Sequence, residues 1–220
     1  MNKTFITGVD QNYEWLLKWW VRNLRKHNKD VHLTICDFGI SKDILNWAKS
    51  NAEVVKSYNP HPKCAWYYKT QSLLDSKYEF SCWIDSDCEI LKPIEDIFDY
   101  AKKDFIGLTE DIGKRITEKD HWWATGVILI KNSSNILQDW DKQLKKLTDR
   151  GDQEALHYLL NQNPQYKSLI TSLPIEYQWL RLQLELMQQD SPDKKIVHWT
   201  GSRGKSHIRN NLMISSDYFK

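Results

Sequence analysis

Two aspartates separated by one serine stand directly after an apolar run, in the segment 80–89 (FSCWIDSDCE). If the chain stays extended through Ser86, the side chains of Asp85 and Asp87 project to the same side. Neighbouring carboxylates repel each other, and a shared hard cation such as manganese or magnesium relieves that repulsion. Such a cation can in turn hold a diphosphate, for which Asp85 and Ser86 are also candidate contacts. The alternative is an ordinary turn after a strand, where Asp and Ser are common.

A second polar group follows an apolar run near the C-terminus, in the segment 194–205 (KKIVHWTGSRGK). The neutral imidazole of His198 is a good metal ligand at the end of a strand. Gly201 lets the backbone approach a phosphate. Lys205 offsets the charge of a leaving diphosphate, and Arg203 is a rival for that contact. A surface loop with a hydrogen-bonded histidine is the structural alternative.

Asp152 and Gln153 open a predicted helix after Gly151. An aspartate at this position can simply cap the helix. The same placement also brings an acid and an amide near the end of a sheet, where they can contact a bound ligand. We expect this second role for both residues.

Aromatic side chains lie beside polar residues in the segment 122–127 (WWATGV). Trp122 and Trp123 offer flat rings that stack well on sugar faces, although tryptophan is also a common core residue. Thr125 and Gly126 follow, and a glycine here lets a sugar lie close to the backbone. We expect these four residues at an acceptor or donor-sugar site, with a glycine at a strand start as the alternative.

Four earlier residues are candidates for nucleotide binding. Thr7 and Asp10 lie at the end of the first predicted strand, and Asp37 follows the second, although Asp37-Phe-Gly also resembles a turn. Lys69 lies in the run 66–70 (WYYKT), which opens the predicted helix that precedes the aspartate pair. In open α/β sheets, ligands bind outside the carboxyl ends of the strands, which is where these residues are expected.

The alternation of apolar runs and helical patterns predicts an α/β fold with a mainly parallel central sheet flanked by helices. Strands are predicted at 4–8, 32–36, 53–57, 80–84, 105–108, 126–130, 169–173 and 195–198. Helices are predicted at 13–27, 42–50, 65–75, 93–101, 134–148, 153–161 and 179–189. No repeat or long linker interrupts the sequence. We therefore expect a single domain over 1–220, with a nucleotide-binding half at 1–90 and a half for the acceptor and donor sugar at 91–220.

The composition excludes some classes of protein. The 220 residues include 31 basic and 29 acidic ones, for a net charge of +2 and no basic stripe, so nucleic acid is not an expected partner. The four cysteines form no CxxC pair and are expected to be buried free thiols, which favours a reducing, cytoplasmic location. No signal peptide or transmembrane segment is expected from the apolar runs.

Together these segments resemble the GT-A fold glycosyltransferases, in particular glycosyltransferase family 8 and related nucleotide-sugar transferases with a DxD motif. Residues 85–87 match DxD, and 152–153 match the D-Q helix start of that family. Residues 198–205 are similar to its H-x-x-G-x-x-K signature, with one extra residue between Gly201 and Lys205. Residues 124–127 are similar to its N-x-G-V segment, with Ala and Thr in place of the usual Asn or Ser. The resemblance spans about residues 4 to 209.

The resemblance implies a metal-dependent glycosyltransferase that moves a sugar from a nucleotide-diphosphate donor, typically UDP-linked, to an acceptor hydroxyl. Manganese or magnesium is expected on Asp85, Asp87 and His198. The acceptor, whether glycan, lipid or protein, stays open.

The resemblance also implies catalytic roles for Asp152 and Gln153, which would bind the hydroxyls of the donor sugar and face its anomeric carbon. The D-Q element favours retention of anomeric configuration. An inverting enzyme would need a general base, for which the candidates are Asp111, Asp120 and His121.

Two other functions fit parts of the sequence. A metal-dependent nucleotidyltransferase of related fold would normally carry a glycine-rich, basic loop after its first strand, whereas residues 8–12 here are GVDQN. A non-catalytic, tryptophan-rich carbohydrate-binding module would use the 11 tryptophans but has no need of the aspartate pair, His198 and the D-Q element together.

Overall fold

The computed structural model describes residues 2–59, 64–117, 121–147 and 151–213, in which helices and strands alternate. The strands are β1 (Lys3–Val9), β2 (Leu33–Asp37), β3 (Val54–Ser57), β4 (Phe80–Ile84), β5 (Cys88–Ile90), β6 (Ile106–Glu110), β7 (Trp123–Lys131), β8 (Ile170–Ser172), β9 (Trp179–Leu180) and β10 (Ile196–His198). The α-helices are α1 (Trp15–His27), α2 (Lys42–Asn51), α3 (Lys69–Leu74), α4 (Ile112–Thr117), α5 (Asn135–Lys146), α6 (Asp152–Gln162), α7 (Arg181–Glu185) and α8 (Gly201–His207). Short 3₁₀ helices are η1 (Ala65–Tyr68), η2 (Glu95–Tyr100), η3 (Pro164–Leu169) and η4 (Ile175–Tyr177), and η5 (Ile208–Leu212) is a π-helical turn.

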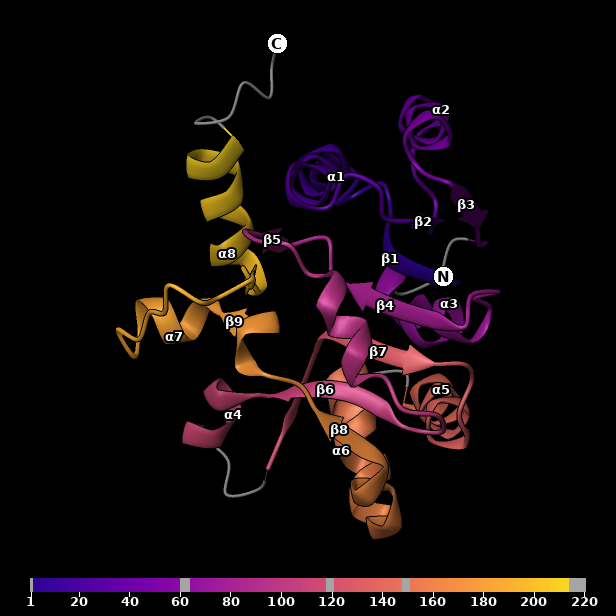
Figure 1. The fold of residues 1–220 in the computed structure, drawn as a ribbon, viewed down its shortest axis with the longest axis vertical. Helices are drawn as coiled ribbons and strands as arrows, with labels where there is room; N and C mark the ends of the chain where they lie inside the picture. The colour runs from indigo at the N-terminus through magenta and orange to yellow at the C-terminus, as the bar shows by residue number, and fades with distance from the viewer. Residues whose placement is uncertain (1, 60–63, 118–120, 148–150, 214–220) are drawn as a thin grey trace.

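Seven strands form the central sheet, in the order β3-β2-β1-β4-β7-β6-β8 (Figure 1). The strands β1 to β4 run parallel to one another, whereas β7 runs antiparallel to both of its neighbours, β4 and β6. The last strand, β8, is parallel to β6. The expected α/β fold with a mainly parallel sheet is therefore confirmed. Because β1, β2 and β4 all end at the same edge, that edge gathers the residues that follow them.

Helices cover both faces of the central sheet. One core contains the apolar face of α1, including Leu16, Trp20 and Leu24, whose spacing of four residues puts them on one side of the helix. The opposite core contains α3, α5 and α6, with Trp140 of α5 completely buried.

A second, smaller sheet has the order β5-β10-β9. Strand β10 runs antiparallel to β5, with His198 opposite Cys88 and Ile196 opposite Ile90. The predicted C-terminal strand thus exists, but it lies in this small sheet and not in the central one. Its pairing with β5, which comes directly after the aspartate pair, brings the two ends of the predicted site together.

Several predicted helices are shorter or tighter than expected. The helix expected at 93–101 is the 3₁₀ helix η2, and the one expected at 65–75 is divided between η1 and α3. The helix expected at 179–189 is confined to α7, because Trp179 and Leu180 pair with β10 and are extended. The predicted break at 149–151 lies mostly outside the described residues.

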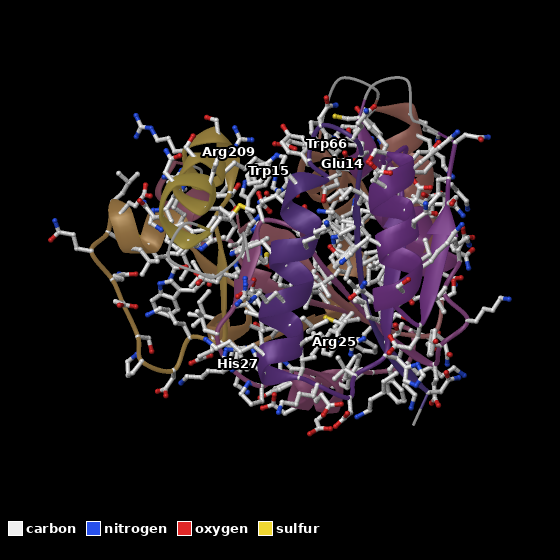
Figure 2. All side chains as sticks on the ribbon, turned by 90° about the horizontal axis from the view of Figure 1, so that it is seen from above. Glu14, Trp15, Arg25, His27, Trp66 and Arg209 are labelled. Atoms are coloured by element: carbon white, nitrogen blue, oxygen red, sulfur yellow. The ribbon has the colours of Figure 1, made fainter. Side chains whose placement is uncertain are left out.

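The C-terminal helical segment returns to the first helix. Figure 2 shows Arg209 of η5 beside Trp15 at the start of α1, and its guanidinium carbon lies 4.4 Å from the centre of the indole ring. Ile208 and Met213 are buried in the same core as α1. This packing fixes α8, which carries Lys205, at the edge of the central sheet.

The four cysteines form no disulfide, and Cys36, Cys82 and Cys88 are buried as expected, whereas Cys64 is only partly buried. Burial raises the pKa of the Cys36 thiol to about 12, so this thiol stays protonated at neutral pH. Among the described residues, no helix combines the length and the apolar character that crossing a membrane requires.

Candidate active site

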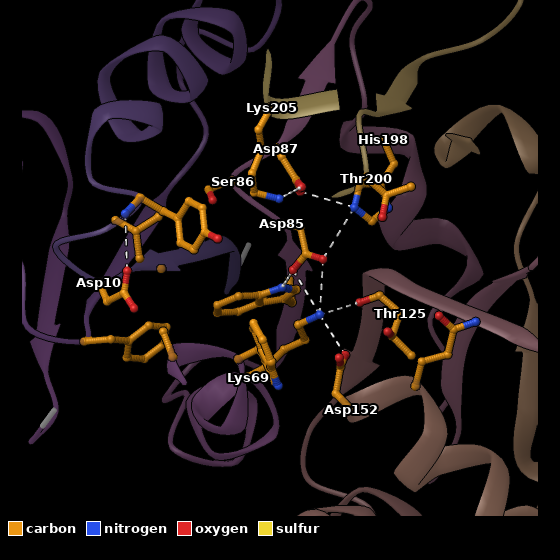
Figure 3. A pocket seen from close by; sticks show the side chains of 18 of the residues that line it. Asp10, Lys69, Asp85, Ser86, Asp87, Thr125, Asp152, His198, Thr200 and Lys205 are labelled. Atoms are coloured by element: carbon orange, nitrogen blue, oxygen red, sulfur yellow. Dashed lines mark hydrogen bonds and ion pairs between the residues drawn. The ribbon is translucent and has the colours of Figure 1, made fainter. Parts of the chain in front are cut away.

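A cavity of about 260 Å³ opens at the edge where β1 and β4 end (Figure 3). Its wall includes most of the residues that the sequence predicts for the site: Asp10, Lys69, Asp85, Ser86, Asp87, Thr125, Asp152, Gln153, His198, Gly201 and Lys205. Residues from both predicted halves of the chain therefore meet in one place.

Asp87 and His198 lie side by side because of the small sheet. The backbone N–H of Trp199 donates to the carbonyl oxygen of Asp87 at 3.0 Å, which continues the pairing of β10 with β5. The Nε2 atom of His198 consequently lies 3.2 Å from Oδ1 of Asp87 and 3.7 Å from Oδ2 of Asp85. Burial tends to lower the pKa of His198, but the carboxylates of Asp87 and Asp85 overcome this effect and raise it.

Lys205 approaches Asp87 from the other side. Its Nζ donates to Oδ2 of Asp87 at 2.6 Å, from the first two turns of α8. Burial alone would raise the pKa of Asp87, but His198 and Lys205 hold it well below its ordinary value. Asp87 is therefore ionised at neutral pH and already shares its charge with a cation from the chain.

Lys69 occupies the centre of the site, where it is 3% exposed. Its Nζ lies 3.0 Å from Oδ1 of Asp85 and 2.8 Å from Oδ2 of Asp152, and it donates to the carbonyl oxygen of Thr125 at 3.0 Å (Figure 3). Burial acts to lower the pKa of Lys69, but Asp152 and Asp85 raise it. The buried ammonium thus joins the aspartate pair to the start of α6.

Asp85 is held more firmly than Asp87. Its Oδ1 accepts a hydrogen bond from Nε1 of Trp83 at 2.6 Å, and its backbone N–H donates to the carbonyl oxygen of Gly126 at 2.8 Å. Burial raises its pKa more than Lys69 and His198 lower it. These contacts leave Asp85 less free than Asp87 to bind an external group.

Asp152 and Gln153 open α6, but neither caps it. Gly151 is the N-cap residue, and the carboxylate of Asp152 is turned to Lys69. The indole of Trp140 fixes this helix start by donating to the carbonyl oxygen of Asp152 at 2.9 Å. Nε2 of Gln153 donates to Oδ2 of Asp111 at 2.7 Å. The structural alternative of a capping aspartate is therefore not what the geometry shows.

The two candidate general bases that the structure describes, Asp111 and His121, make contacts with other side chains. Asp111 accepts from Gln153 through one oxygen and from the backbone N–H of Lys114, at 2.9 Å, through the other. His121 is half-exposed, and its Nδ1 lies 3.2 Å from Oε1 of Glu110. Asp120 lies outside the described residues.

Of the candidates at the ends of the first two strands, Asp10 lines the cavity, whereas Thr7 and Asp37 do not. Asp10 lines the cavity, and its Oδ1 accepts from the backbone N–H of Asn12 at 3.0 Å. Thr7 is fully buried in β1 and is not part of the cavity wall. Asp37 is also off the wall, because its carboxylate accepts from the backbone N–H groups of Gly39 and Ile40 at 2.8 and 2.9 Å. The structure thus shows Asp37 in the turn that the sequence offered as an alternative.

The two adjacent tryptophans also lie away from this cavity. Trp122 is buried and stacks on the ring of His157, with centroids 3.8 Å apart. Trp123 lines a separate cavity of about 200 Å³, together with His121, His157 and Asn161. Of the four residues expected at the acceptor or donor-sugar site, only Thr125 belongs to the wall of the main cavity.

Gly126 has a different role from the one expected. A Cβ atom at this position would lie 2.4 Å from Nδ1 of His198 and 2.8 Å from Nε2 of Gln178, both of which are buried. The missing side chain therefore makes room for the imidazole and leaves no surface for a sugar. A glycine inside a strand gives no sequence signal for such a contact.

We expect Gly126→Ala to lower the free energy of unfolding by about 1–3 kcal/mol, because His198 and Gln178 must move to accommodate the methyl group. We also expect weaker manganese binding, since the imidazole would leave Asp87. Urea denaturation and manganese titration measure the two effects. The matched control is Gly201→Ala, where φ is 78° and no atom lies within 4 Å, so that only backbone strain is added. Equal manganese affinity in Gly126→Ala and the parent would contradict this role.

Several residues of the cavity were missed by the sequence analysis. Tyr13 and Trp66 are exposed aromatic residues on its wall, and Phe38 and Thr200 also line it. Tyr13 had a signal that could have identified it, because it follows the first strand closely, as Asp10 does. The sequence offers no comparable indication for Gln178, because this residue lies in a turn and its contacts appear only in the folded structure.

One group of side-chain atoms is arranged so that it could bind a metal ion. Among the described residues, Asp87, Cys88 and His198 offer ligand atoms that all lie within 4.8 Å of one another. Cys88 is completely buried, and burial raises the pKa of its thiol well above the ordinary value, so it is not a ligand for a hard cation. The donor set that fits manganese or magnesium is therefore the carboxylate of Asp87 and the imidazole of His198, with Asp85 outside the tightest group.

No protein-family model and no curated protein sequence matches the chain. Solved structures do match its fold. The galactosyltransferase LgtC, in complex with donor and acceptor sugar analogs, superimposes with a TM-score of 0.67 at 14% identity, over 90% of this chain and 87% of that one. The glycosyltransferase GlyE of Streptococcus pneumoniae TIGR4 gives 0.66 at 15% identity, over 92% and 55%. The bifunctional glycosyltransferase WbbM gives 0.62 at 13% identity, over 90% and 46%.

These likenesses show that the chain has the GT-A glycosyltransferase fold, as the sequence resemblance implied. The chain spans most of LgtC but only about half of GlyE and WbbM. At 13–15% identity the comparison concerns the fold, and the chemistry depends on the residues of the cavity.

Proposed function

We propose that the protein is a metal-dependent glycosyltransferase that moves a sugar from a nucleotide-diphosphate donor, UDP-linked, to an acceptor hydroxyl. One observation carries the proposal. Oδ1 of Asp87 and Nε2 of His198, from opposite halves of the sequence, lie 3.2 Å apart on the wall of a cavity that also contains Asp152 and Gln153.

In this proposal Asp87 and His198 hold manganese or magnesium, and Asp85 contributes directly or through water and the ribose. The existing ion pair between Lys205 and Asp87 supports the fit, since the carboxylate is arranged to receive a positive charge. A bound cation would offset the charge that develops on the departing diphosphate. Lys205 is then released from Asp87 and, with the backbone at Gly201, contacts the diphosphate.

The nucleotide would lie over the end of β1, beside Asp10 and Ser86 on the cavity wall. Thr7 and Asp37, which are off the wall, would act by supporting the ends of β1 and β2. Lys69 would hold the carboxylates of Asp85 and Asp152 in fixed positions. The donor sugar would then contact the carboxylate of Asp152 and the amide of Gln153. This order follows the cavity from Asp10 at one end to Asp152 at the other (Figure 3).

A retaining reaction agrees with the positions of the candidate bases Asp111 and His121. Both oxygens of Asp111 already accept hydrogen bonds, and His121 lines the second cavity. We propose that the acceptor, whose class is open, enters near Thr125. The second cavity, with Trp123 on its wall, would receive a more distant part of it. The absence of disulfides among the four cysteines supports a reducing, cytoplasmic location as part of the same proposal.

A thermal-shift experiment with UDP and manganese, separately and together, tests this function. We expect stabilisation that requires both, because the cation and the diphosphate bind each other. A screen of nucleotide sugars for slow hydrolysis with manganese then identifies the donor. Stabilisation by free sugars alone, with no response to UDP and manganese, would favour a carbohydrate-binding module. A response to nucleoside triphosphates but not to UDP would favour a nucleotidyltransferase.

A further inference from the structure

A buried glutamine contacts the side of His198 that faces away from Asp87. Gln178 follows η4, is 1% exposed, and places its Nε2 atom 3.2 Å from Nδ1 of His198. None of the roles described above uses this residue, although it touches the one imidazole on the cavity wall.

The orientation of the Gln178 carboxamide is fixed by its other contacts. Its Oε1 accepts from the backbone N–H of Val127 at 2.8 Å and from the hydroxyl of Thr109 at 3.3 Å. A backbone N–H can only donate, so the carbonyl end of the carboxamide must face Val127. Turning the group around would place its NH₂ against that N–H and leave a buried donor without a partner.

The tautomer of His198 follows from this orientation. The NH₂ group of Gln178 can only donate, so Nδ1 of His198 must accept. The imidazole then carries its proton on Nε2, which faces Oδ1 of Asp87 at 3.2 Å and Oδ2 of Asp85 at 3.7 Å. A histidine that ligates a metal through Nε2 has the opposite arrangement, because its other ring nitrogen donates to an acceptor.

We propose that Gln178 is a positioning residue that keeps the proton of His198 on Nε2, so that the imidazole donates to Asp87 and resists ligating a cation until the carboxamide turns around. The part that concerns the cation rests on the proposed function, whereas the position of the proton does not. Gln178 thereby lowers the affinity of the site for metal, since part of the binding free energy is used to reverse a buried amide.

The position of the proton can be read from the metal-free protein. Two-bond ¹H–¹⁵N spectra of the ¹⁵N-labelled chain distinguish protonated from unprotonated ring nitrogens, and the His198 signals are those missing in His198→Asn. We expect Nε2 protonated and Nδ1 unprotonated in the parent. In Gln178→Glu the new carboxylate accepts from Nδ1, so we expect the proton there. A proton on Nδ1 in the parent would overturn the proposal.

The second arm measures manganese affinity from the electron paramagnetic resonance of the free ion. Gln178→Glu supplies an acceptor for Nδ1, and we expect about tenfold tighter binding. Gln153→Glu is the matched control, because it adds the same charge to the cavity wall without touching His198. A gain in Gln178→Glu no larger than that in Gln153→Glu would overturn the claim about the cation.

Two further outcomes keep the test decisive. If the parent and both variants bind no manganese, the proposed function fails, and the proposal about the tautomer is still decided by the spectra. If Gln178→Glu does not fold, Gln178→Leu removes the donor instead, and we expect it to give a mixture of both tautomers. A single Nε2-protonated form in Gln178→Leu would show that Gln178 does not set the tautomer.

Discussion

Replacing Asp87 with asparagine is expected to lower manganese-dependent turnover of the donor by about 10³-fold, or about 4 kcal/mol. The substitution keeps the volume of the side chain and an oxygen that can accept from Lys205 or His198, whose present contacts are 2.6 and 3.2 Å. It removes the charge that attracts the cation. Because the side chain lies on a cavity wall and keeps its shape, we expect the fold to survive.

Donor hydrolysis with and without manganese measures this effect, and circular dichroism checks the fold. Asp193→Asn is a suitable control, since its side chain is 80% exposed and lies away from the cavity. It should behave as the parent does. If Asp87→Asn binds manganese as tightly as the parent and keeps its activity, the proposed ligand set is wrong.

Replacing Lys69 with methionine should destabilise the protein by about 3 kcal/mol, because it leaves two carboxylates buried without their shared counter-ion. Lys69 lies within 3.0 Å of both Asp85 and Asp152, whose side chains are 22% and 14% exposed. We also expect activity to fall, since the start of α6 would no longer be tied to the aspartate pair.

Urea denaturation measures the loss of stability. Lys205→Met is the matched control, and we expect a smaller loss, because Lys205 is more exposed and Asp87 keeps His198 as a neighbour. In the double variant Lys69→Met/Asp152→Asn, part of the lost stability should return, since one of the unpaired charges is removed. An equal loss in Lys69→Met and Lys205→Met would argue against Lys69 as the buried centre of the site.

The sequence predicts the central sheet well because its strands are continuous apolar runs. The buried segments of β1, β4 and β7 contain four or more apolar or small residues in succession. Short runs of this kind are typical of buried strands. The position of the aspartate pair could be predicted for the same reason, because the end of β4 determines where the two carboxylates lie. The D-Q and histidine segments were located by resemblance to a family and not by periodicity.

What the sequence did not predict depends on short elements and on single contacts. Strands β5 and β9 have three and two residues, too few to show a period, and yet they determine that His198 meets Asp87. Trp122 and Trp123 resembled a sugar-binding surface, but stacking on His157 covers Trp122. Gln178 was missed because a glutamine in a turn gains its role only when Val127 fixes its amide.

The most direct test of the account is a crystal structure of the protein with UDP and manganese, using the anomalous scattering of the metal to locate it. We expect one manganese peak about 2.1 Å from a carboxylate oxygen of Asp87 and from Nε2 of His198, with Lys205 moved from Asp87 to the diphosphate. A manganese ion bound to UDP but away from both side chains, or UDP bound outside the cavity, would contradict it.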